Sequence, residues 1–159
     1  MKRLNFPYLI ILFLCAALIV SAGCSNKGNE ITIENGRIIL AFDKKTGALV
    51  SFSDLVSSQV YYDKNLPSFS PWEVELTDSS GTQTIDISDA CKFRYRNPDV
   101  STLILEWKKF EDLKNKNFRI TAIVSLDEVK QMSSWSISLD GTAGMQVNKL
   151  AFPRIKIIE

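Results

Sequence analysis

The chain has 159 residues, with 19 lysines and arginines against 18 aspartates and glutamates, and it contains no histidine. A near-neutral chain without a basic run carries no electrostatic footprint for nucleic acid, so we expect no nucleic-acid partner. Without histidine the chain cannot form imidazole bases, Ser-His or Cys-His nucleophile pairs, or histidine-based metal sites. We therefore predict no catalytic residue, no bound metal and no cofactor.

The first residues have the pattern of an export signal. Lys2 and Arg3 precede an uninterrupted apolar run from Leu9 to Val20. At ~1.5 Å rise per residue this run gives roughly 18 Å of helix, too short for a hydrocarbon core of about 30 Å. We therefore predict a cleaved signal peptide over residues 1–23 rather than a membrane-spanning helix.

The end of this segment, Ser21-Ala22-Gly23-Cys24, resembles the lipobox of bacterial lipoproteins, in which small residues precede a cysteine that is lipidated and becomes the new N-terminus. Ser21 departs from that pattern, which has an aliphatic residue there. The resemblance implies a lipid anchor at Cys24 and attachment to a membrane of the bacterial cell envelope. An ordinary secretory signal with an incidental cysteine is the alternative. Ser25 is not the aspartate that retains some lipoproteins at the inner membrane, which favours the outer membrane or the cell surface.

The remainder of the chain divides into two parts. Residues 24–30 are mostly polar and predict a tether, and residues 31–159 are long enough for one domain with its own core. Cys91 is the only cysteine left after the signal peptide and the lipidated Cys24, so no internal disulfide can form. We expect Cys91 to be a small buried side chain.

The stretch from Ile31 to Asp54 predicts a β-hairpin. Ile38, Leu40 and Phe42 share one parity, which places apolar side chains on one face of a strand. The run Asp43-Lys44-Lys45-Thr46-Gly47 then predicts a turn. Its aspartate suits the first position, where the carboxylate caps backbone N–H groups, and its glycine suits the last position, where φ is often positive.

Alternating apolar and polar residues predict further strands, at intervals of about 8–12 residues. They cover Val60–Tyr62, Trp72–Thr77, Thr82–Ser88, Lys92–Arg96, Thr102–Phe110, Phe118–Val124, Ser134–Leu139 and Val147–Ile158. With about ten strands and no amphipathic helix, the chain is predicted to be an all-β, antiparallel β-sandwich. The last strand reaches the C-terminus without a turn or polar tail. We therefore expect a chain that once continued, with uncovered apolar surface around and after Leu150.

Several of these runs carry a resemblance to a known family. Arg37–Asp43 followed by Lys45–Leu49 resembles the opening of the N-terminal β-supersandwich domain of bacterial glycoside-hydrolase-like proteins. Trp72–Leu76, Trp135–Leu139 and Phe152–Arg154 resemble later blocks of that domain. The resemblance implies a galactose-mutarotase-like fold, a carbohydrate ligand and a (β/α)₈ barrel partner. It implies no catalytic residue here, because the catalytic carboxylates of those proteins lie in the barrel and mutarotases use histidine.

Carboxylates and aromatic rings are the remaining candidates for a carbohydrate site. Two carboxylates flanking a glycosidic bond suffice for hydrolysis, but Glu73 and Glu75 have the spacing of any solvated strand face, and Glu106 and Asp86 show no pairing signature.

Trp107 and Trp135 fall in phase with aliphatic residues, which predicts core positions. Trp72, Tyr61 and Tyr62 are the predicted carbohydrate-binding residues, as an exposed aromatic platform. The cationic strip Lys92, Arg94 and Arg96 indicates a solvated or edge-protecting face.

Two functions of different class follow from these observations. The first is a non-catalytic β-sandwich domain of a glycoside-hydrolase-like lipoprotein, present as a fragment, that packs on a barrel and helps shape a carbohydrate site. The second is a free-standing glycan-binding lipoprotein. An aldose epimerase or a small hydrolase is disfavoured by the missing histidine.

The lipid anchor can be tested directly. Acyl chains contribute about 0.8 kcal/mol per buried CH₂, so several chains on one cysteine hold a protein stably on a membrane. We expect Cys24→Ala to move the full-length protein from the membrane fraction to the soluble fraction, measured by detergent partitioning. Unchanged partitioning of the variant would refute lipidation at Cys24.

Overall fold

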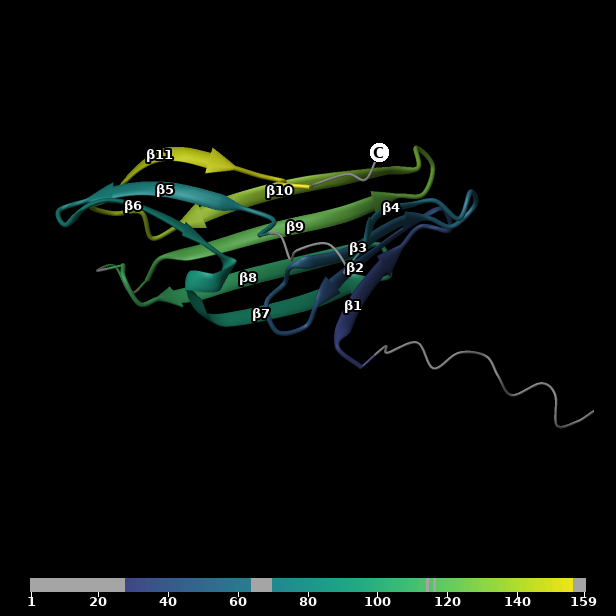
Figure 1. The fold of residues 1–159 in the computed structure, drawn as a ribbon, viewed down its shortest axis with the longest axis horizontal. Helices are drawn as coiled ribbons and strands as arrows, with labels where there is room; N and C mark the ends of the chain where they lie inside the picture. Colours follow the sequence, from purple (N-terminus) through teal and green to yellow (C-terminus); the bar gives the residue numbers. More distant parts are fainter. Residues whose placement is uncertain (1–27, 64–69, 114, 116, 156–159) are drawn as a thin grey trace, which may run out of the picture.

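Three antiparallel sheets make up the part of the chain that the computed structural model describes, residues 28–63, 70–113, 115 and 117–155 (Figure 1). The first sheet has the order β1-β2-β3-β4, the long sheet β10-β9-β8-β7 and the small sheet β11-β5-β6. The strands are β1 Glu30–Glu34, β2 Ile38–Asp43, β3 Leu49–Asp54, β4 Val60–Asp63, β5 Glu73–Asp78, β6 Gly81–Asp86, β7 Ala90–Asp99, β8 Thr102–Phe110, β9 Arg119–Asp127, β10 Met132–Asp140 and β11 Gln146–Ala151. The predicted all-β antiparallel sandwich is confirmed.

The long sheet forms one layer, and the first and small sheets lie side by side over its inner face (Figure 1). Strand β8 shows how the sequence produces this arrangement, because Leu103, Leu105 and Trp107 are buried while Ile104 and Glu106 are partly exposed. Successive side chains of a strand point to opposite faces, so Leu103, Leu105 and Trp107 face the other layer.

Aromatic contacts connect the long sheet to both sheets of the other layer. Phe42 of β2 lies 5.9 Å from Trp135 of β10, measured between ring centroids. Trp72, immediately before β5, meets Trp107 of β8 edge-on at 5.5 Å. Buried side chains from all three sheets thus form one core. Burying a large apolar side chain contributes about 1.5–3 kcal/mol, so this shared core is the main stabilising feature of the fold.

The predicted β2–β3 turn is confirmed in detail. The Asp43 carboxylate accepts hydrogen bonds from the backbone N–H groups of Lys45 at 2.9 Å and Thr46 at 2.8 Å, and Gly47 has φ +75°. The turn also packs against the long sheet, because Trp107 Nε1 donates a 2.7 Å hydrogen bond to the Thr46 carbonyl. Gly47 lies so close to the rings of Phe93 and Trp107 that a Cβ atom would meet them at 2.5 and 2.8 Å.

Aspartates cap turns throughout the described part of the chain. In each case a carboxylate oxygen accepts hydrogen bonds from backbone N–H groups two or three residues later, which is the Asx-turn arrangement. The capping residues are Asp43, Asp54, Asp78, Asp86, Asp99 and Asp127. Much of the acidic side-chain content therefore lies at strand ends and not on sheet faces.

The structure departs from the predicted elements at four places. The last strand, predicted over Val147–Ile158, ends at Ala151, and residues 156–159 lie outside the described residues. Ile87, expected in a strand, lies in a short 3₁₀ helix, Ile87–Asp89, that Asp86 caps. Strand β7 continues past the predicted stop to Asp99, because β7 is an edge strand on which Pro98 need not donate to a ladder. Glu30, predicted as tether, already belongs to β1. The signal peptide and Cys24 lie outside the described residues.

Cys91 is exposed, so the prediction of a buried thiol is wrong. It shares the parity of Phe93, but it lies on an edge strand, where inward parity does not guarantee cover. Partial removal from water and the carboxylate of Glu111 raise the pKa of the Cys91 thiol. The thiol is therefore held in its protonated form.

Strand β11 is largely exposed. Val147 and Leu150 retain 38% and 40% of their exposed area, as expected for uncovered apolar surface near Leu150. Phe152 and Ile155 instead pack against the core, so that expectation is wrong for them. No helix in the described part of the chain is long and apolar enough to cross a membrane.

The close approach at Gly47 makes a testable prediction. Gly47→Ala introduces a methyl group into the rings of Phe93 and Trp107, and overpacking of this kind costs about 1–3 kcal/mol of unfolding free energy. The matched control is Gly36→Ala, because Gly36 also has positive φ (+80°) but no atom lies within 4 Å of the added Cβ. We expect the control to lose about 1 kcal/mol from backbone strain alone, and Gly47→Ala to lose clearly more, in urea denaturation. Equal losses would show that the turn does not press on the long sheet.

Candidate functional site

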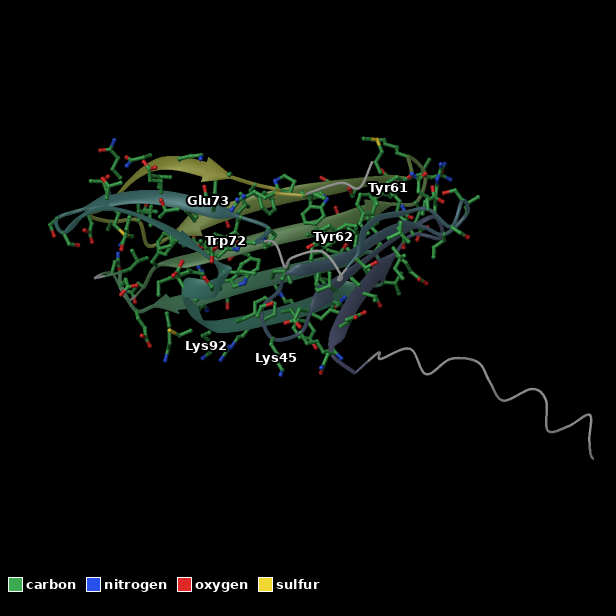
Figure 2. The ribbon with its side chains drawn as sticks, viewed as in Figure 1. Lys45, Tyr61, Tyr62, Trp72, Glu73 and Lys92 are labelled. Carbon is green, nitrogen blue, oxygen red and sulfur yellow. The ribbon has the colours of Figure 1, made fainter. Side chains whose placement is uncertain are left out.

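Two of the three predicted carbohydrate-binding residues are buried. Trp72 is 0% exposed and Tyr62 is 2% exposed, and both lie between the layers (Figure 2). The prediction that they form an exposed platform is therefore wrong. Tyr62 is covered because its parity points it into the core. Trp72, at the start of β5, is covered by the rings of Trp107 and Phe110. Trp107 is buried as predicted, and Trp135 is half-buried against the core.

Tyr61, the third predicted residue, lies half-buried at one end of the molecule, toward the β3–β4 and β9–β10 turns (Figure 2). Its ring packs on Phe52 with centroids 5.0 Å apart. It lines a hollow of about 290 Å³ whose other lining residues are Arg37, Ile38, Phe52, Asp54, Lys130 and Gln131. We call this the Tyr61 hollow. It combines an aromatic face with planar hydrogen-bonding groups, which is the composition of many small-molecule sites.

Three separate turns meet at the Tyr61 hollow through Arg37. Its Nε donates a 2.9 Å hydrogen bond to Asp54 Oδ2 at the start of the β3–β4 turn. Its Nη1 donates a 2.5 Å hydrogen bond to Gln131 Oε1 in the β9–β10 turn. Gln131 has φ +54°, a conformation that costs a non-glycine residue free energy. The polar part of the hollow is thus held in place by the Arg37 guanidinium.

Asp54 is the one charged or polar residue counted as buried in the described structure, at 4% exposure. Its Oδ1 accepts hydrogen bonds from the backbone N–H groups of Val56 at 2.8 Å and Ser57 at 2.9 Å. The Ser57 hydrogen bond and then the Arg37 side chain lower the pKa of Asp54 to about 2. The carboxylate is therefore charged at neutral pH and fixes Arg37.

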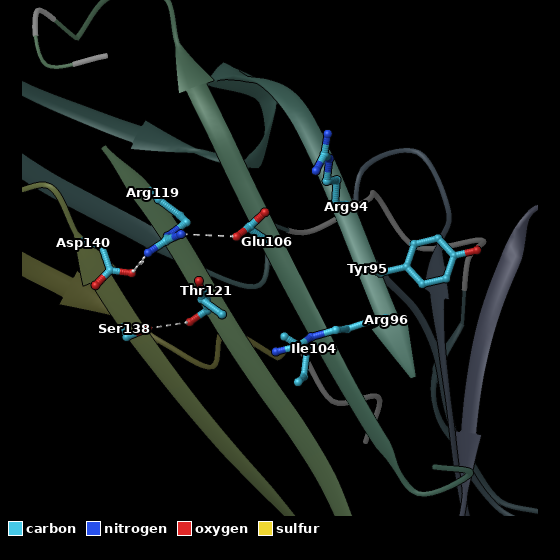
Figure 3. Close-up of a pocket in the computed structure, with 9 residues that line it drawn as sticks. All are labelled: Arg94, Tyr95, Arg96, Ile104, Glu106, Arg119, Thr121, Ser138 and Asp140. Carbon is cyan, nitrogen blue, oxygen red and sulfur yellow. Dashed lines mark hydrogen bonds and ion pairs between the residues drawn. The ribbon is translucent and has the colours of Figure 1, made fainter. Parts of the chain in front are cut away.

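A second hollow lies on the outer face of the long sheet (Figure 3). It has a volume of about 460 Å³ and is lined by Arg94, Tyr95, Arg96, Ile104, Glu106, Arg119, Thr121, Ser138 and Asp140. All four strands of the long sheet contribute, because alternate residues of each strand point away from the core. Tyr95 is the exception, since its side chain is directed to the other side of β7 (Figure 3).

Arg119 lies between the two carboxylates of this hollow (Figure 3). Its Nη2 lies 2.9 Å from Asp140 Oδ2 and its Nη1 lies 3.7 Å from Glu106 Oε2. Lys108 Nζ lies 2.8 Å from the other oxygen of Glu106. Both carboxylates are thus engaged by cations, and an inverting or retaining pair would need at least one of them free to act on a substrate.

Glu73 and Asp86, two of the other candidate carboxylates, are also engaged. Glu73 and Asp86 lie directly opposite each other on β5 and β6, a proximity that the sequence spacing did not indicate. However, Glu73 lies 2.9 Å from Arg154 Nη1, and Asp86 caps the Ser88 N–H. Glu106 lies on another sheet. Among the described residues, no group of three or more histidine, cysteine or acidic side chains is placed to hold a metal ion.

Sequence reasoning missed Arg37, Gln131 and Arg119. Each is separated along the chain from its partners, by 94 residues for Arg37 and Gln131 and by 21 residues for Arg119 and Asp140. Only the pairing of strands and the meeting of turns brings these groups together. No single-strand pattern in the sequence marks them.

No protein-family model matches the chain, and a comparison with curated proteins finds no match. The likeness to the β-supersandwich domain therefore stays a prediction, whereas the antiparallel sandwich itself is observed.

The lowered pKa of Asp54 predicts a pH dependence of stability. A carboxyl whose pKa falls from 3.8 to about 2 on folding contributes stability in full above its unfolded pKa. That contribution is lost as the pH falls through about 4 toward about 2. We expect the urea midpoint of Asp54→Asn to lie well below that of the wild type at about pH 6, and the difference to shrink toward about pH 2. A difference that stays constant across this range would contradict the account.

Proposed function

We propose that this chain is a non-catalytic β-sandwich domain of a cell-envelope lipoprotein, of the kind that accompanies glycoside hydrolases, and that it supports carbohydrate binding at the Tyr61 hollow. The observation that carries the proposal is the composition of this hollow. A half-buried tyrosine ring backed by Phe52 lies beside the Arg37 guanidinium and the Gln131 amide. Pyranose rings present an apolar face and a rim of hydroxyl groups, and these side chains complement both.

The size and rigidity of the Tyr61 hollow also fit a sugar residue. Its volume of about 290 Å³ lies just below the range for ligand pockets, which is about 300–1,000 Å³, as suits a single sugar residue. The Arg37 guanidinium is fixed by Asp54 and Gln131 before any ligand arrives. Fixed polar groups bind with a smaller loss of conformational entropy than mobile ones. The lipobox resemblance supports the envelope location, and the β-supersandwich resemblance supports the association with a barrel.

A free-standing glycan-binding lipoprotein is the second candidate. The Tyr61 hollow favours it, because its described lining already combines the Tyr61 ring with the hydrogen-bonding groups of Arg37 and Gln131. The two candidates differ in the gene context. A (β/α)₈ barrel reading frame directly downstream of the Glu159 codon would support the accompanying domain, and an unrelated gene there would support the free-standing binder.

Binding can be tested with the full-length protein in non-ionic detergent. We expect neutral oligosaccharides on a glycan array to bind, followed by titration calorimetry on the best of them. Tyr61→Ala removes the stacking ring and should weaken binding about tenfold, since an aromatic contact contributes about 0.5–1.5 kcal/mol. Tyr61→Phe keeps the ring and should remain within about threefold of the wild type. Tyr95→Ala, at an exposed tyrosine outside the hollow, is the control and should change nothing.

Two outcomes would overturn the proposal. If Tyr61→Ala binds as the wild type does, the hollow is not the site. If the protein hydrolyses aryl glycosides and one glutamate substitution abolishes this activity, the chain is an enzyme.

A further inference from the structure

The outer face of the long sheet carries three cations directly opposite one another on adjacent strands. Lys92 of β7 pairs with Lys108 of β8, and Lys108 pairs with Arg119 of β9. Opposed residues in an antiparallel pair have Cβ atoms only about 4.5–5.5 Å apart, so like charges at such positions destabilise a sheet. Ion pairs with Glu106 and Asp140 offset this repulsion at Lys108 and Arg119, but no described carboxylate forms an ion pair with Lys92.

A fourth cation joins this row through an unusual backbone conformation. Lys109 has φ +59°, which lies in the left-handed region that non-glycine residues seldom adopt. The next residue, Phe110, stays in the core, and Lys109 lines the same hollow as Lys108. This hollow has a volume of about 440 Å³ and is lined by Lys92, Lys108, Lys109, Asn117, Phe118, Arg119, Asp140 and Gly141. It shares Arg119 and Asp140 with the hollow of Figure 3.

The positive charge of this face is only partly neutralised. Glu106 and Asp140 are the acidic residues that line the two hollows, and both are engaged by Lys108 or Arg119. Arg94 and Arg96 continue the row of cations along β7 from Lys92. Their backbones pair with β8, but the side chains of Lys92, Arg94 and Arg96 form no hydrogen bond or ion pair with another described residue. Because the whole chain has 19 cations and 18 anions, this excess is a local concentration and not a general basicity.

Protection of sheet edges does not account for the arrangement. Charged side chains on an edge strand discourage pairing with another chain, and β7 is such an edge. However, Lys108 and Arg119 lie on β8 and β9, the two central strands of the long sheet. A cation there protects no edge. Glu106 and Asp140 pair with these two cations, but two carboxylates do not balance the six cations that line the two hollows.

We propose that the outer face of the long sheet binds an anionic polysaccharide whose carboxylate or sulfate groups lie over Lys92, Lys108 and Arg119. Strand β10 supplies the second half of the chemistry, because Ser138 is exposed, lines the hollow of Figure 3 together with Arg119, and can hydrogen-bond sugar hydroxyls. The face is poorly suited to nucleic acid, because Phe118 is buried and Tyr95 is directed away, which leaves no ring in the lining on which bases stack (Figure 3). This site shares no lining residue with the Tyr61 hollow, so the two proposals stand independently.

The test uses the full-length protein in non-ionic detergent and four polymers: polygalacturonate, heparin, dextran and single-stranded DNA. We expect polygalacturonate or heparin to bind in low salt and to be released as NaCl is raised, because added ions screen the charges. Dextran should not bind, and DNA should bind at least tenfold more weakly. The preference between polygalacturonate and heparin assigns the anionic group as carboxylate or sulfate.

Two charge variants provide the matched comparison. The double substitution Lys92→Gln and Lys108→Gln should weaken polysaccharide binding at least tenfold. Lys44→Gln with Lys149→Gln removes the same number of charges outside both hollows of the long sheet and outside the Tyr61 hollow, and should change binding less than twofold. Lys92→Gln alone should leave the urea midpoint of the unliganded protein unchanged or raised, because it relieves the repulsion with Lys108.

Three results would overturn the proposal. The first is no binding of either anionic polysaccharide at low salt. The second is equal loss of binding in the two double variants, which would mean that binding depends only on the net charge of the protein. The third is DNA binding as tight as polysaccharide binding, which would mean that the face does not distinguish a polysaccharide from a nucleic acid.

Discussion

Trp107 connects the two layers of the sandwich, and much of the fold depends on it. Its indole N–H donates to the Thr46 carbonyl of the β2–β3 turn, its ring meets Trp72 of the small sheet edge-on, and Gly47 lies directly against it. One buried side chain on a central strand of the long sheet therefore contacts both sheets of the opposite layer. Because Trp107 must point inward, its neighbours Glu106 and Lys108 must point outward. The same constraint that closes the core thus sets which charges the outer face presents.

The sequence predicted strands well because period-two alternation is a direct consequence of strand geometry. The Asp43–Gly47 turn was predictable for a similar reason, since its carboxylate cap and its positive φ are local properties. Burial was harder. Parity shows that Tyr61 and Tyr62 face opposite sides, but not which side is covered, and for Trp72 the cover comes from residues far along the chain. The prediction for Cys91 was wrong in the opposite direction. It was expected to be buried, but its inward position on an edge strand leaves the side chain exposed.

Neither the Tyr61 hollow nor the two hollows on the outer face of the long sheet could be derived from the sequence. The strip Lys92, Arg94 and Arg96 is visible on one strand, and a solvated or edge-protecting face was a reasonable interpretation of it. Its meaning changes when the register places Lys108 beside Lys92 and Arg119 beside Lys108. Likewise, Tyr61 gains hydrogen-bonding neighbours only because Arg37 joins two turns that are distant in the chain. The Tyr61 hollow and the hollows of the long sheet all arise from strand register and turn packing, which are properties of the whole fold.

The capping of turns by aspartate affects how charge is distributed over the surface of the molecule. Six carboxylates are placed at strand ends, while the lysines and arginines of the long sheet gather on one flat flank. The formal net charge of only +1 therefore conceals a local excess of positive charge on that flank. Beside a negatively charged surface, such a molecule does not tumble evenly. The field draws the cationic flank toward the surface, so that near a charged layer the molecule would spend most of its time in one orientation.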